Sequence, residues 1–527
     1  MKKLNKNEEV LFELISKKNE ITLKEIIEEL SIERRTVQRA IKTLLQQELI
    51  SALGTTRDRI YRRKFQEQEA PFKYVVFQSG VKVGELYFGN GEYVFIYDEK
   101  YKGEELEGLT KAIHNHSHEL FAYFENLIPE YKRRERLLQN KNDIAEVLES
   151  LTNSHGALDF IQKHKLFEYK SNYGKRKNWI SVKNKILLEN DFPNLIEADI
   201  QISDDVLNAD SNTEHSDLSG YQTKIDVNID FEKMIINESK QAEYLLKPRN
   251  KNKSNYFNQD EDGTKRYYPY IAINEHLFMS FAKNELGLDV PYSGIIKAKD
   301  IDFHYITKRY DRIDGLKYNQ VDFAQVLNVQ SDNKYKVSSE ELFNAINIKL
   351  TSSDAKLEAI KFYYYSYLIK HADLHLKNMG ALEIGMKKYI LTPLYDVISV
   401  GIYNGDSWDL GLSMQEPYKK PKNWNLNDFY KLAKIVGISE LLFKKEARII
   451  TEKFITKMPE YIERLKEFEK IYPLNMQQTR VGSYKGFSQR VENMYKDKII
   501  QLKKLGIIQE LNLIDIAGGL LSREQKN

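Results

Sequence analysis

The segment His371-Ala-Asp-Leu-His-Leu-Lys-Asn378 follows a strongly aromatic stretch that is predicted to be a helix. Asp373 and Asn378 lie in it, and a short hydrophobic segment, Tyr389-Ile-Leu-Thr-Pro-Leu-Tyr395, leads to a second carboxylate, Asp396. Phosphoryl transfer uses such a set: one carboxylate orients the attacking hydroxyl, and an asparagine and a later carboxylate hold Mg²⁺ against the phosphates. Single Asp and Asn residues in loops are more often turn formers. The ordered set nevertheless predicts a phosphoryl-transfer site.

These two motifs resemble the catalytic and metal-binding motifs of the HipA family of bacterial serine/threonine kinases, the toxins of HipBA-type toxin–antitoxin modules. Other segments resemble further landmarks of the family in the same order, over about residues 72–415. They are Phe124-Glu-Asn-Leu-Ile-Pro-Glu130 and Gly156-Ala-Leu158 (N-terminal subdomain), Leu218-Ser-Gly-Tyr-Gln-Thr-Lys224 (phosphate loop), Tyr244-Leu-Leu-Lys-Pro248 (strand with the ATP lysine), Glu285-Leu-Gly-Leu-Asp-Val-Pro291 (after the glutamate helix) and Tyr305-Ile-Thr-Lys-Arg-Tyr-Asp-Arg312 with Asp322-Phe-Ala-Gln325 (hinge).

The resemblance implies a role for each of these residues. Asp373 would accept or align the proton of the substrate hydroxyl, and His375 and Lys377 would shape the same catalytic loop. Asn378 and Asp396 would bind Mg²⁺. The residues implied in ATP binding are Ser219, Gly220, Gln222, Lys224, Lys247, Glu275, Lys308, Tyr310 and Gln325, with Lys247 reaching the phosphates and Glu275 holding it. An ordinary surface ion pair is the alternative for Lys247 and Glu275.

The phosphate loop departs from the family pattern at one position. Family members commonly carry a serine three residues before the loop glycine, and its autophosphorylation ejects the loop and silences the kinase. Here Asp217 stands at that position, with Ser216 before it, while Ser219 directly precedes Gly220. Ser216 and Ser219 are therefore the autophosphorylation candidates, and control at the usual position is in doubt.

The first 64 residues predict a winged helix-turn-helix domain. Apolar residues recur at helical spacing in three blocks, within residues 10–15, 23–30 and 37–45. Thr22 and Glu25 form a predicted capping box for the second helix, and Ser31 is placed to cap the third. The segment from Gly54 to Arg63 follows as a predicted two-stranded wing with a basic tip.

The predicted third helix has side chains that suit DNA on its non-core side, namely Arg34, Arg35, Gln38, Arg39 and Lys42. Residues 1–64 contain fifteen Lys/Arg and ten Asp/Glu, whereas the whole chain, with 80 basic and 77 acidic residues, has a net charge of only +3. The basic character is therefore local. We predict that this domain binds DNA, as a dimer on a two-fold operator. The alternative is a dimerisation or docking module whose charges face solvent.

After a polar linker, three strand-like runs cover residues 73–78, 82–88 and 93–97. Residues 104–151 have a helical pattern. His114, His116 and His118 alternate within it, and on a helix this spacing places the rings on different faces. We therefore predict no metal site there.

The resemblance implies an α+β chain: a bilobal, protein-kinase-like HipA fold preceded by a small α/β winged helix-turn-helix domain. The expected boundaries are 1–64 for the DNA-binding domain, 65–71 for the linker and 72–165 for the N-terminal subdomain. The kinase N-lobe with its ATP-binding loop would occupy 166–330, and the helical C-lobe with the catalytic motifs 331–527. ATP would lie in the cleft between the lobes.

Composition excludes several classes of protein. The chain has 527 residues, 41% hydrophobic and 30% charged, which is typical of folded globular domains. It has no cysteine, so disulfides, thiolate zinc sites and cysteine nucleophiles are excluded. No apolar run approaches the ~18–20 residues of a membrane span, and the first residues lack an apolar signal core. The sequence therefore predicts a cytoplasmic protein without membrane contact.

The function predicted from motifs and resemblance together is that of an ATP-dependent serine/threonine protein kinase of HipA type, a toxin-like regulator of growth or translation that also binds DNA. Implied cofactors are ATP and Mg²⁺, and the implied substrate is a protein such as an aminoacyl-tRNA synthetase or another translation component. Two alternatives stay open: a transcription regulator that uses a kinase fold to sense nucleotide, and a small-molecule phosphotransferase. A separate antitoxin and a homodimer are open partners.

Overall fold

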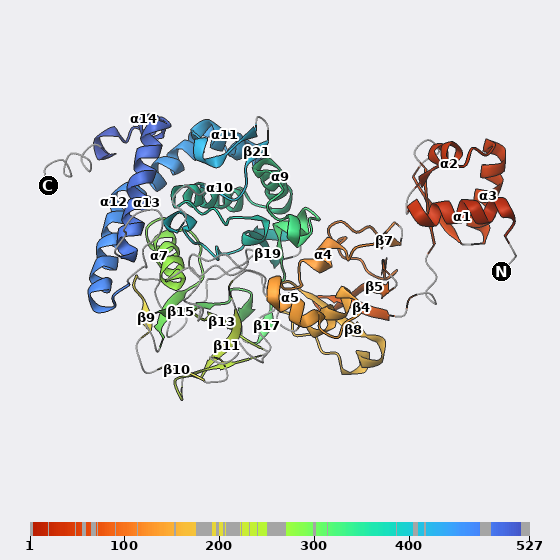
Figure 1. Ribbon diagram of the computed structural model, residues 1–527, viewed down its shortest axis with the longest axis horizontal. Coiled ribbons are helices and arrows are strands. Elements are labelled where there is room, and N and C mark those ends of the chain that lie inside the picture. The colour runs from red at the N-terminus through yellow and green to blue at the C-terminus, as the bar shows by residue number, and fades with distance from the viewer. Residues whose placement is uncertain are drawn as a thin grey trace. The chain divides into compact units, whose positions relative to one another are not determined.

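The computed structural model divides the chain into two compact units (Figure 1). The first comprises Met1–Ile128, Arg134–Leu151 and Ala157–Ser171, and the second Pro129–Arg133, Thr152–Gly156 and Asn172–Asn527. The structure describes residues 4–18, 21–47, 49–54, 59–64, 70, 72–89, 91–112, 114–151, 154–174, 192–196, 200–203, 206, 222, 224–230, 232–239, 241–249, 270–298, 302–313, 315–385, 387–403, 409–415, 418–474 and 486–517.

The described residues between 4 and 64 form a helix-turn-helix fold with a small sheet, as predicted. Three helices, α1 (Lys6–Lys18), α2 (Leu23–Leu30) and α3 (Arg34–Gln46), pack with a small antiparallel sheet in the order β1-β3-β2 (Ile21–Thr22, Ile60–Arg63 and Ile50–Leu53). The apolar residues predicted to face inwards form the core, among them Leu11, Ile15, Ile26, Val37, Ile41 and Leu44. The helical spacing of the apolar residues in the sequence therefore predicted the core of this domain correctly.

The two predicted helix caps have different outcomes. The capping box of α2 is confirmed, because the Glu25 N–H donates to Thr22 Oγ1 at 3.3 Å and the Thr22 N–H donates to Glu25 Oε2 at 2.8 Å. The prediction that Ser31 caps α3 is wrong. Ser31 ends α2 in the left-handed conformation (φ 52°), and its N–H donates to the Ile27 carbonyl. An N-cap residue needs extended backbone, and α3 instead begins after Glu33 without a side-chain cap.

The rest of the first unit is built on an antiparallel sheet in the order β7-β6-β5-β4-β8. Its strands β4 (Phe72–Gln78), β5 (Val81–Gly89) and β6 (Glu92–Tyr97) confirm the three predicted runs. The helical prediction for residues 104–151 is largely wrong: the described helices there are α4 (Ala122–Glu125) and α5 (Tyr131–Leu138), with a 3₁₀ segment, η2 (Ile144–Ser150). Strands β7 (Asn115–Ser117) and β8 (Leu158–Gln162) complete the sheet.

The histidines of this region do not lie on a helix. His116 is in β7, which pairs with β6, and alternate residues of a strand share a face. His114 and His118 lie just outside this three-residue strand, so the expectation that the three histidines lie on a helix is wrong. Within the described ranges, no three His, Asp or Glu residues are grouped so that they could hold a metal ion.

The second unit has a mixed sheet in the order β10-β12-β11-β13-β15-β14-β9. The central strands β11 (Ile225–Asp230), β13 (Tyr244–Lys247), β15 (Phe303–Lys308) and β14 (Ser293–Lys297) are antiparallel. Parallel pairs with β12 (Ile235–Glu238) and β14 join the short outer strands β10 (Gln201–Ile202) and β9 (Leu195–Ile196). Helix α7 (Ile271–Asn284) lies against β14 and β15 and is almost wholly buried.

The remainder of this unit is mainly helical (Figure 1). Its elements are α8 (Phe323–Val326), α9 (Ser339–Lys349), α10 (Ser353–Leu368), α11 (Leu426–Ile435), α12 (Glu440–Ile471), α13 (Phe487–Lys504) and α14 (Ile507–Glu510), with the short segments η5 (Ser331–Asn333), η6 (Leu376–Asn378), η7 (Val400–Ile402) and η8 (Pro421–Asn423). Between them lie β18 (Gln320–Asp322) and the hairpin β19–β20 (Gly380–Gly385 and Lys388–Leu391), and β20 contains the first residues of the hydrophobic segment that leads to Asp396.

The aromatic stretch predicted to be helical is the second half of α10. Its four tyrosines are fully buried, and each hydroxyl has a partner, as buried phenols require. The Tyr363 and Tyr364 hydroxyls lie 2.7 Å from the hydroxyls of Ser339 and Thr451, while those of Tyr365 and Tyr367 donate to backbone carbonyls of α7 and of Trp424. The loop that follows α10 is therefore attached to a rigid support.

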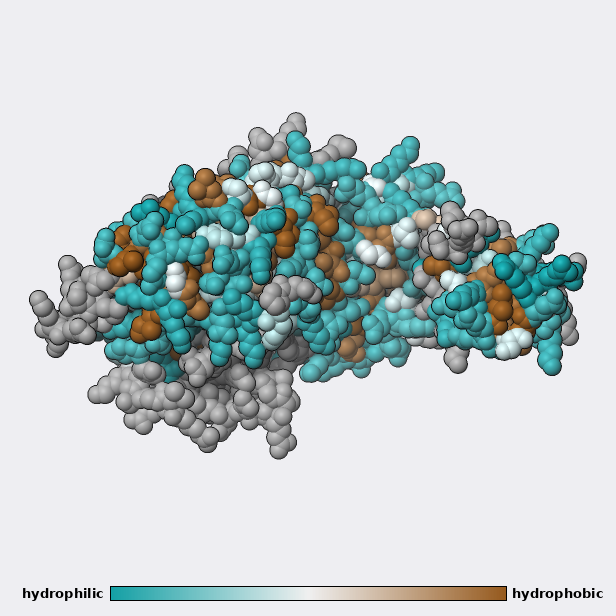
Figure 2. Space-filling model, turned by 90° about the horizontal axis from the view of Figure 1, so that it is seen from above, coloured by the Kyte–Doolittle hydropathy of each residue, from teal (hydrophilic) through white to brown (hydrophobic). Residues whose placement is uncertain are grey.

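The structure confirms the α+β fold class. No helix among the described residues is both long enough and apolar enough to cross a membrane. The face drawn in Figure 2 is mostly hydrophilic, with hydrophobic residues scattered over it.

Candidate functional site

A cavity of about 450 Å³ lies in the second unit. Almost all described residues that the sequence assigned to catalysis, metal or nucleotide line it: Asp373, His375, Lys377, Asn378, Asp396, Gln222, Lys224, Lys247, Glu275, Lys308 and Tyr310. They come from segments more than 150 residues apart in the chain, and the fold brings them together. Part of the wall is apolar, with Leu245, Ile271, Met279, Pro291, Val321 and Ile398.

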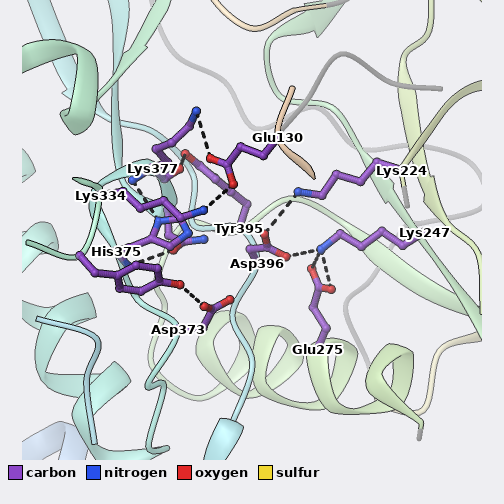
Figure 3. Close-up of polar contacts among 12 residues, drawn as sticks. Glu130, Lys224, Lys247, Glu275, Lys334, Asp373, His375, Lys377, Tyr395 and Asp396 are labelled. Atoms are coloured by element: carbon purple, nitrogen blue, oxygen red, sulfur yellow. Dashed lines mark hydrogen bonds and ion pairs between the residues drawn. The ribbon is translucent and has the colours of Figure 1, made fainter. Parts of the chain in front are cut away.

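Asp396 is the centre of an ionic cluster (Figure 3). Its carboxylate accepts hydrogen bonds from Lys247 Nζ and, at 3.4 Å, from Lys224 Nζ. Lys247, at the end of β13, also donates to both carboxylate oxygens of Glu275 on α7, at 2.8 Å each. Asp396 itself has a left-handed backbone (φ 59°), which aspartate tolerates better than most residues. Lys247 and Glu275 are therefore a buried pair and not a surface one.

Burial and charge act against each other in this cluster. Burial alone would raise the pKa of Asp396, but Lys224 and Lys247 outweigh it and hold that pKa far below its usual range. Burial would likewise lower the pKa of Lys247, but Asp396 and Glu275 outweigh it, and the pKa is raised. For Lys224 the pKa is lowered, by burial first and then by the charge of Lys247. A second anion beside the two ammonium groups would therefore stabilise the charged form of Lys224.

The loop after α10 presents the predicted catalytic residues. His375 caps the short segment η6: the Lys377 N–H donates to its Nδ1 at 3.1 Å, and its own N–H donates to Asn378 Oδ1 at 3.0 Å. Burial lowers the pKa of His375 well below its usual value, so the ring is neutral and its proton is on Nε2. Gly411 packs so closely behind the loop that a Cβ there would lie 2.3 Å from the Leu374 carbonyl oxygen. The loop backbone is thus fixed from both sides.

Asp373 and Lys377 have partners that the sequence did not indicate. The hydroxyl of Tyr335 donates to Asp373 Oδ1. Burial raises the pKa of Asp373, and the bond from Tyr335 opposes this. Lys377 Nζ donates to Ser331 Oγ at 2.8 Å and lies 3.4 Å from Glu130 Oε1.

Glu130 in turn accepts from Lys334 Nζ at 2.5 Å (Figure 3). Burial alone would raise the pKa of Glu130, but Lys377 and Lys334 outweigh it and lower that pKa. Glu130 is 204 residues from Lys334, so no local pattern could reveal this contact. The pair Lys334-Tyr335 stands in a polar segment without periodicity, and the only signal for Tyr335 is an aromatic residue among polar ones.

Three predicted nucleotide residues have further contacts. Lys308 is bound to Glu243, and Tyr310 donates to Gln320 Oε1 at 2.6 Å while its ring stacks on Tyr395 with centroids 6.0 Å apart. Gln325 does not line the cavity. Its side chain completes the capping box of α8 by accepting from the Asp322 N–H at 3.1 Å. This placement gives no support to a contact between Gln325 and ATP.

Some predicted residues lie outside the described residues. These are Ser216, Asp217, Ser219 and Gly220 in the phosphate loop, the wing tip at 55–58, and 65–69 and 71 of the linker.

The cavity fits a nucleoside polyphosphate and a divalent cation. An apolar wall suits a planar base, and the ammonium groups of Lys224 and Lys247 suit phosphates. The amide of Asn378 and the carboxylate of Asp396 are hard oxygen ligands, and Mg²⁺ is usually held by one or two carboxylates together with phosphates and water. These residues could therefore hold Mg²⁺ between the protein and a triphosphate.

A buried ionic network supports the wall near Tyr310. The guanidinium of Arg309 binds Asp226 at 2.8 Å and Asp311 at 2.9–3.0 Å, and Arg312 Nη1 binds Asp311 at 2.7 Å. Burial alone would raise the pKa of Asp311, but Arg309 and Arg312 outweigh it and lower that pKa well below its usual range.

Asp311→Asn should therefore destabilise the protein by about 3 kcal/mol at pH 7, because it leaves buried guanidinium charge without its partner. Because the pKa of Asp311 is lower in the folded than in the unfolded protein, its charged carboxylate stabilises the fold fully above about pH 4. This stabilisation is lost as the pH falls further. The difference in free energy of unfolding between Asp311→Asn and wild type, measured by urea unfolding, should become smaller below pH 4. The exposed Asp497→Asn is the matched control. Equal stability of Asp311→Asn and wild type at pH 7 would contradict this account.

The first unit offers a separate candidate surface. Arg34, Arg35, Gln38, Arg39 and Lys42 are all exposed on α3, while Val37, Ala40, Ile41 and Leu44 of the same helix are buried. The basic side chains therefore form one face of the helix, opposite the core.

Two family models match separate parts of the chain. Residues 216–462 match the HipA-like C-terminal domain family, and residues 6–62 match the HTH domain family. A Haemophilus influenzae protein named "Putative kinase" is 27% identical over 281 residues, which span 48% of this chain and 74% of that protein. "Putative kinase Y4dM" of Sinorhizobium fredii is 27% identical over 198 residues, or 36% of this chain and 48% of that protein.

The fold also has a counterpart among solved structures. A chain from the Shewanella oneidensis complex of HipA, HipB and operator DNA matches with a TM-score of 0.55 and 16% identity, over 83% of this chain and 99% of that chain. At this identity the likeness concerns the fold alone.

Proposed function

This chain carries a HipA-like C-terminal domain at residues 216–462 and an HTH domain at residues 6–62, and from this premise we propose that it is an ATP-dependent serine/threonine protein kinase that also binds DNA. The observation that carries the proposal is the cavity in which Asp373, Asn378 and Asp396 meet the buried pair of Lys247 and Glu275. Both named relatives are described as kinases, which supports the same activity.

Each group has a defined task in the proposed reaction. Lys247, held by Glu275, and Lys224 bind the phosphates of ATP, and Asn378 and Asp396 hold Mg²⁺. Bound there, Mg²⁺ supplies positive charge that neutralises the phosphate oxygens. Asp373 accepts a hydrogen bond from the acceptor hydroxyl and takes its proton. A new bond forms between the acceptor oxygen and the γ-phosphorus, the bond to the β–γ bridging oxygen breaks, and ADP leaves.

Asp373 suits this task because burial has already raised its pKa, which makes it a better proton acceptor than an exposed carboxylate. The acceptor we propose is a serine or threonine of a protein, such as an aminoacyl-tRNA synthetase or another translation component. Phosphorylation of that protein would control growth, as a toxin does. The test is incubation with γ-labelled ATP and Mg²⁺ followed by phosphoamino-acid analysis and peptide mapping. Label on phosphoserine or phosphothreonine is expected, and mapping shows whether Ser216 or Ser219 carries it. No transferred label would contradict the proposal.

DNA binding is the second part of the proposal, and the exposed basic face of α3 supports it. In a winged helix-turn-helix this helix enters the major groove, where arginines neutralise phosphates and glutamine can read adenine. A single such domain buries a modest surface. We therefore propose that two copies bind a two-fold operator.

Arg35→Ala combined with Arg39→Ala should weaken DNA binding by roughly 10- to 100-fold, because two cationic contacts are lost. The slope of affinity against salt concentration should also become shallower by about two. A gel shift with the DNA upstream of the chain's own gene, across a salt series, measures both. Lys24→Ala, a change of an exposed lysine on α2, is the control. A DNA affinity that changes neither with the double mutation nor with the salt concentration would mean that this domain binds protein instead.

A further inference from the structure

Tyr335 connects an exposed part of the molecule to the proposed catalytic carboxylate. Its side chain is 42% exposed, yet its hydroxyl donates to Asp373 Oδ1, the contact drawn on Asp373 in Figure 3. The rings of Tyr335 and His375 also make an edge-to-face contact, with centroids 4.9 Å apart and planes at 84°. A partly exposed tyrosine is thus held by two residues of the catalytic loop.

The backbone around Tyr335 is fixed as well. The preceding residue, Lys334, is bound through Nζ to Glu130 at 2.5 Å, and its carbonyl faces the Leu376 N–H of the catalytic loop at 3.5 Å. The Lys336 N–H closes a turn by donating to the Asn333 carbonyl at 2.8 Å. Because both neighbours are anchored, the backbone of Tyr335 is fixed, and its contacts with Asp373 and His375 hold the side chain.

The two carboxylate oxygens of Asp373 have different surroundings. Oδ1 is occupied by Tyr335, whereas the structure records no hydrogen bond to Oδ2 from any described residue. Asp373 lines the cavity, so Oδ2 is the oxygen left for an acceptor hydroxyl. We infer that Tyr335 is a positioning residue, which fixes the Asp373 carboxylate so that Oδ2 meets the acceptor. The inference rests on the proposed kinase function and adds to it the residue that orients its proton acceptor.

The bond also has a consequence for pH dependence. Among the described residues, Tyr335, Asp396, Lys334 and Lys224 act on the charge of Asp373, and the ring of His375 packs against Tyr335. Among them Tyr335 lowers the pKa of Asp373, because its hydroxyl stabilises the charged carboxylate. Without that hydroxyl the pKa rises, and the carboxylate needed for proton transfer is lost at a higher pH.

Tyr335→Phe is the test variant, because it removes the hydroxyl and keeps the ring on His375. We expect kcat to fall roughly tenfold, because the loss of one hydrogen bond to a charged group has about this effect. The assay measures ADP release with Mg·ATP and with dephosphorylated casein as the serine-bearing acceptor. The acid limb of the rate profile should move up by about one pH unit. The KM for ATP should stay unchanged, since the substitution keeps the ring on His375 and removes the hydroxyl that donates to Asp373, which is not assigned to the phosphates. Tyr418→Phe, an exposed tyrosine away from the cavity, is the matched control.

The outcomes separate this inference from the proposed function. Inactivity of the wild type itself would reject the kinase proposal. An active wild type with an unaltered kcat and pH profile in Tyr335→Phe would reject only the role of Tyr335. Phosphate found on Tyr335 by intact-mass analysis and peptide mapping would also overturn the inference, because Tyr335 would then be an acceptor and not a positioning residue.

Discussion

Asp373→Asn should lower the rate of phosphoryl transfer by roughly 10³-fold while leaving the affinity for ATP nearly unchanged. The amide keeps the size of the side chain and can still contact Tyr335, but it cannot take a proton, and general-base catalysis contributes about 10²- to 10⁴-fold. Asp373 is not among the residues assigned to the phosphates or to Mg²⁺, so we expect nucleotide binding to depend little on it. The measurement is single-turnover transfer from labelled ATP beside a fluorescence titration with a labelled ATP analogue.

The exposed Asp332→Asn, close in sequence to Tyr335, serves as the matched control for this change. A variant at Asp373 that retains wild-type transfer would remove the assigned proton acceptor. Loss of ATP affinity together with transfer would mean instead that the catalytic loop had lost its shape.

Asp396→Asn should also lower the rate of phosphoryl transfer strongly, but by a different route. Asp396 is the assigned Mg²⁺ carboxylate and also the anion that binds Lys224 and Lys247. The amide of the variant lacks the negative charge that attracts the metal ion, and electrostatic stabilisation of this kind is worth roughly 10²- to 10³-fold for a single lost contact. The variant should therefore show weak ATP binding that no longer strengthens when Mg²⁺ is added.

Asp396→Asn also has an expected effect without nucleotide. The two ammonium groups lose an anionic partner, and Lys247 keeps Glu275 as its carboxylate partner among the described residues. A buried charge that loses its partner costs about 3–5 kcal/mol, so the thermal midpoint of the nucleotide-free variant should be below that of wild type. Isothermal titration with ATP, with and without Mg²⁺, and thermal unfolding measure the two effects. Mg²⁺-dependent ATP binding equal to that of wild type would contradict the assignment of Asp396.

The parts of this account that the sequence could predict depend on local order along the chain. Asp373 and Asn378 lie in one loop, and the hairpin before Asp396 follows from a short hydrophobic segment. The helices of the first domain follow from apolar spacing, because a helix repeats every 3.6 residues. Lys247 and Glu275 come from segments that only the family resemblance connected, and the structure pairs them.

The parts that failed depend on contacts between distant segments or on backbone conformation. Tyr335 reaches Asp373 across 38 residues, and Glu130 reaches Lys334 across 204, so neither contact has a local signal. Strand β7 exists because β6 provides its pairing partner, and a helical pattern was predicted in its place. Ser31 was assigned as a cap by residue type alone, but its left-handed backbone ends α2.

The central claim is that the protein transfers phosphate from ATP to protein hydroxyls with Asp373 as the proton acceptor, and it is tested most directly by quantitative phosphoproteomics. Cells expressing the wild-type chain are compared with cells expressing Asp373→Asn at equal protein levels. The account predicts phosphoserine or phosphothreonine sites that are present with wild type and absent with the variant. The same phosphosites at the same occupancy in both would contradict it.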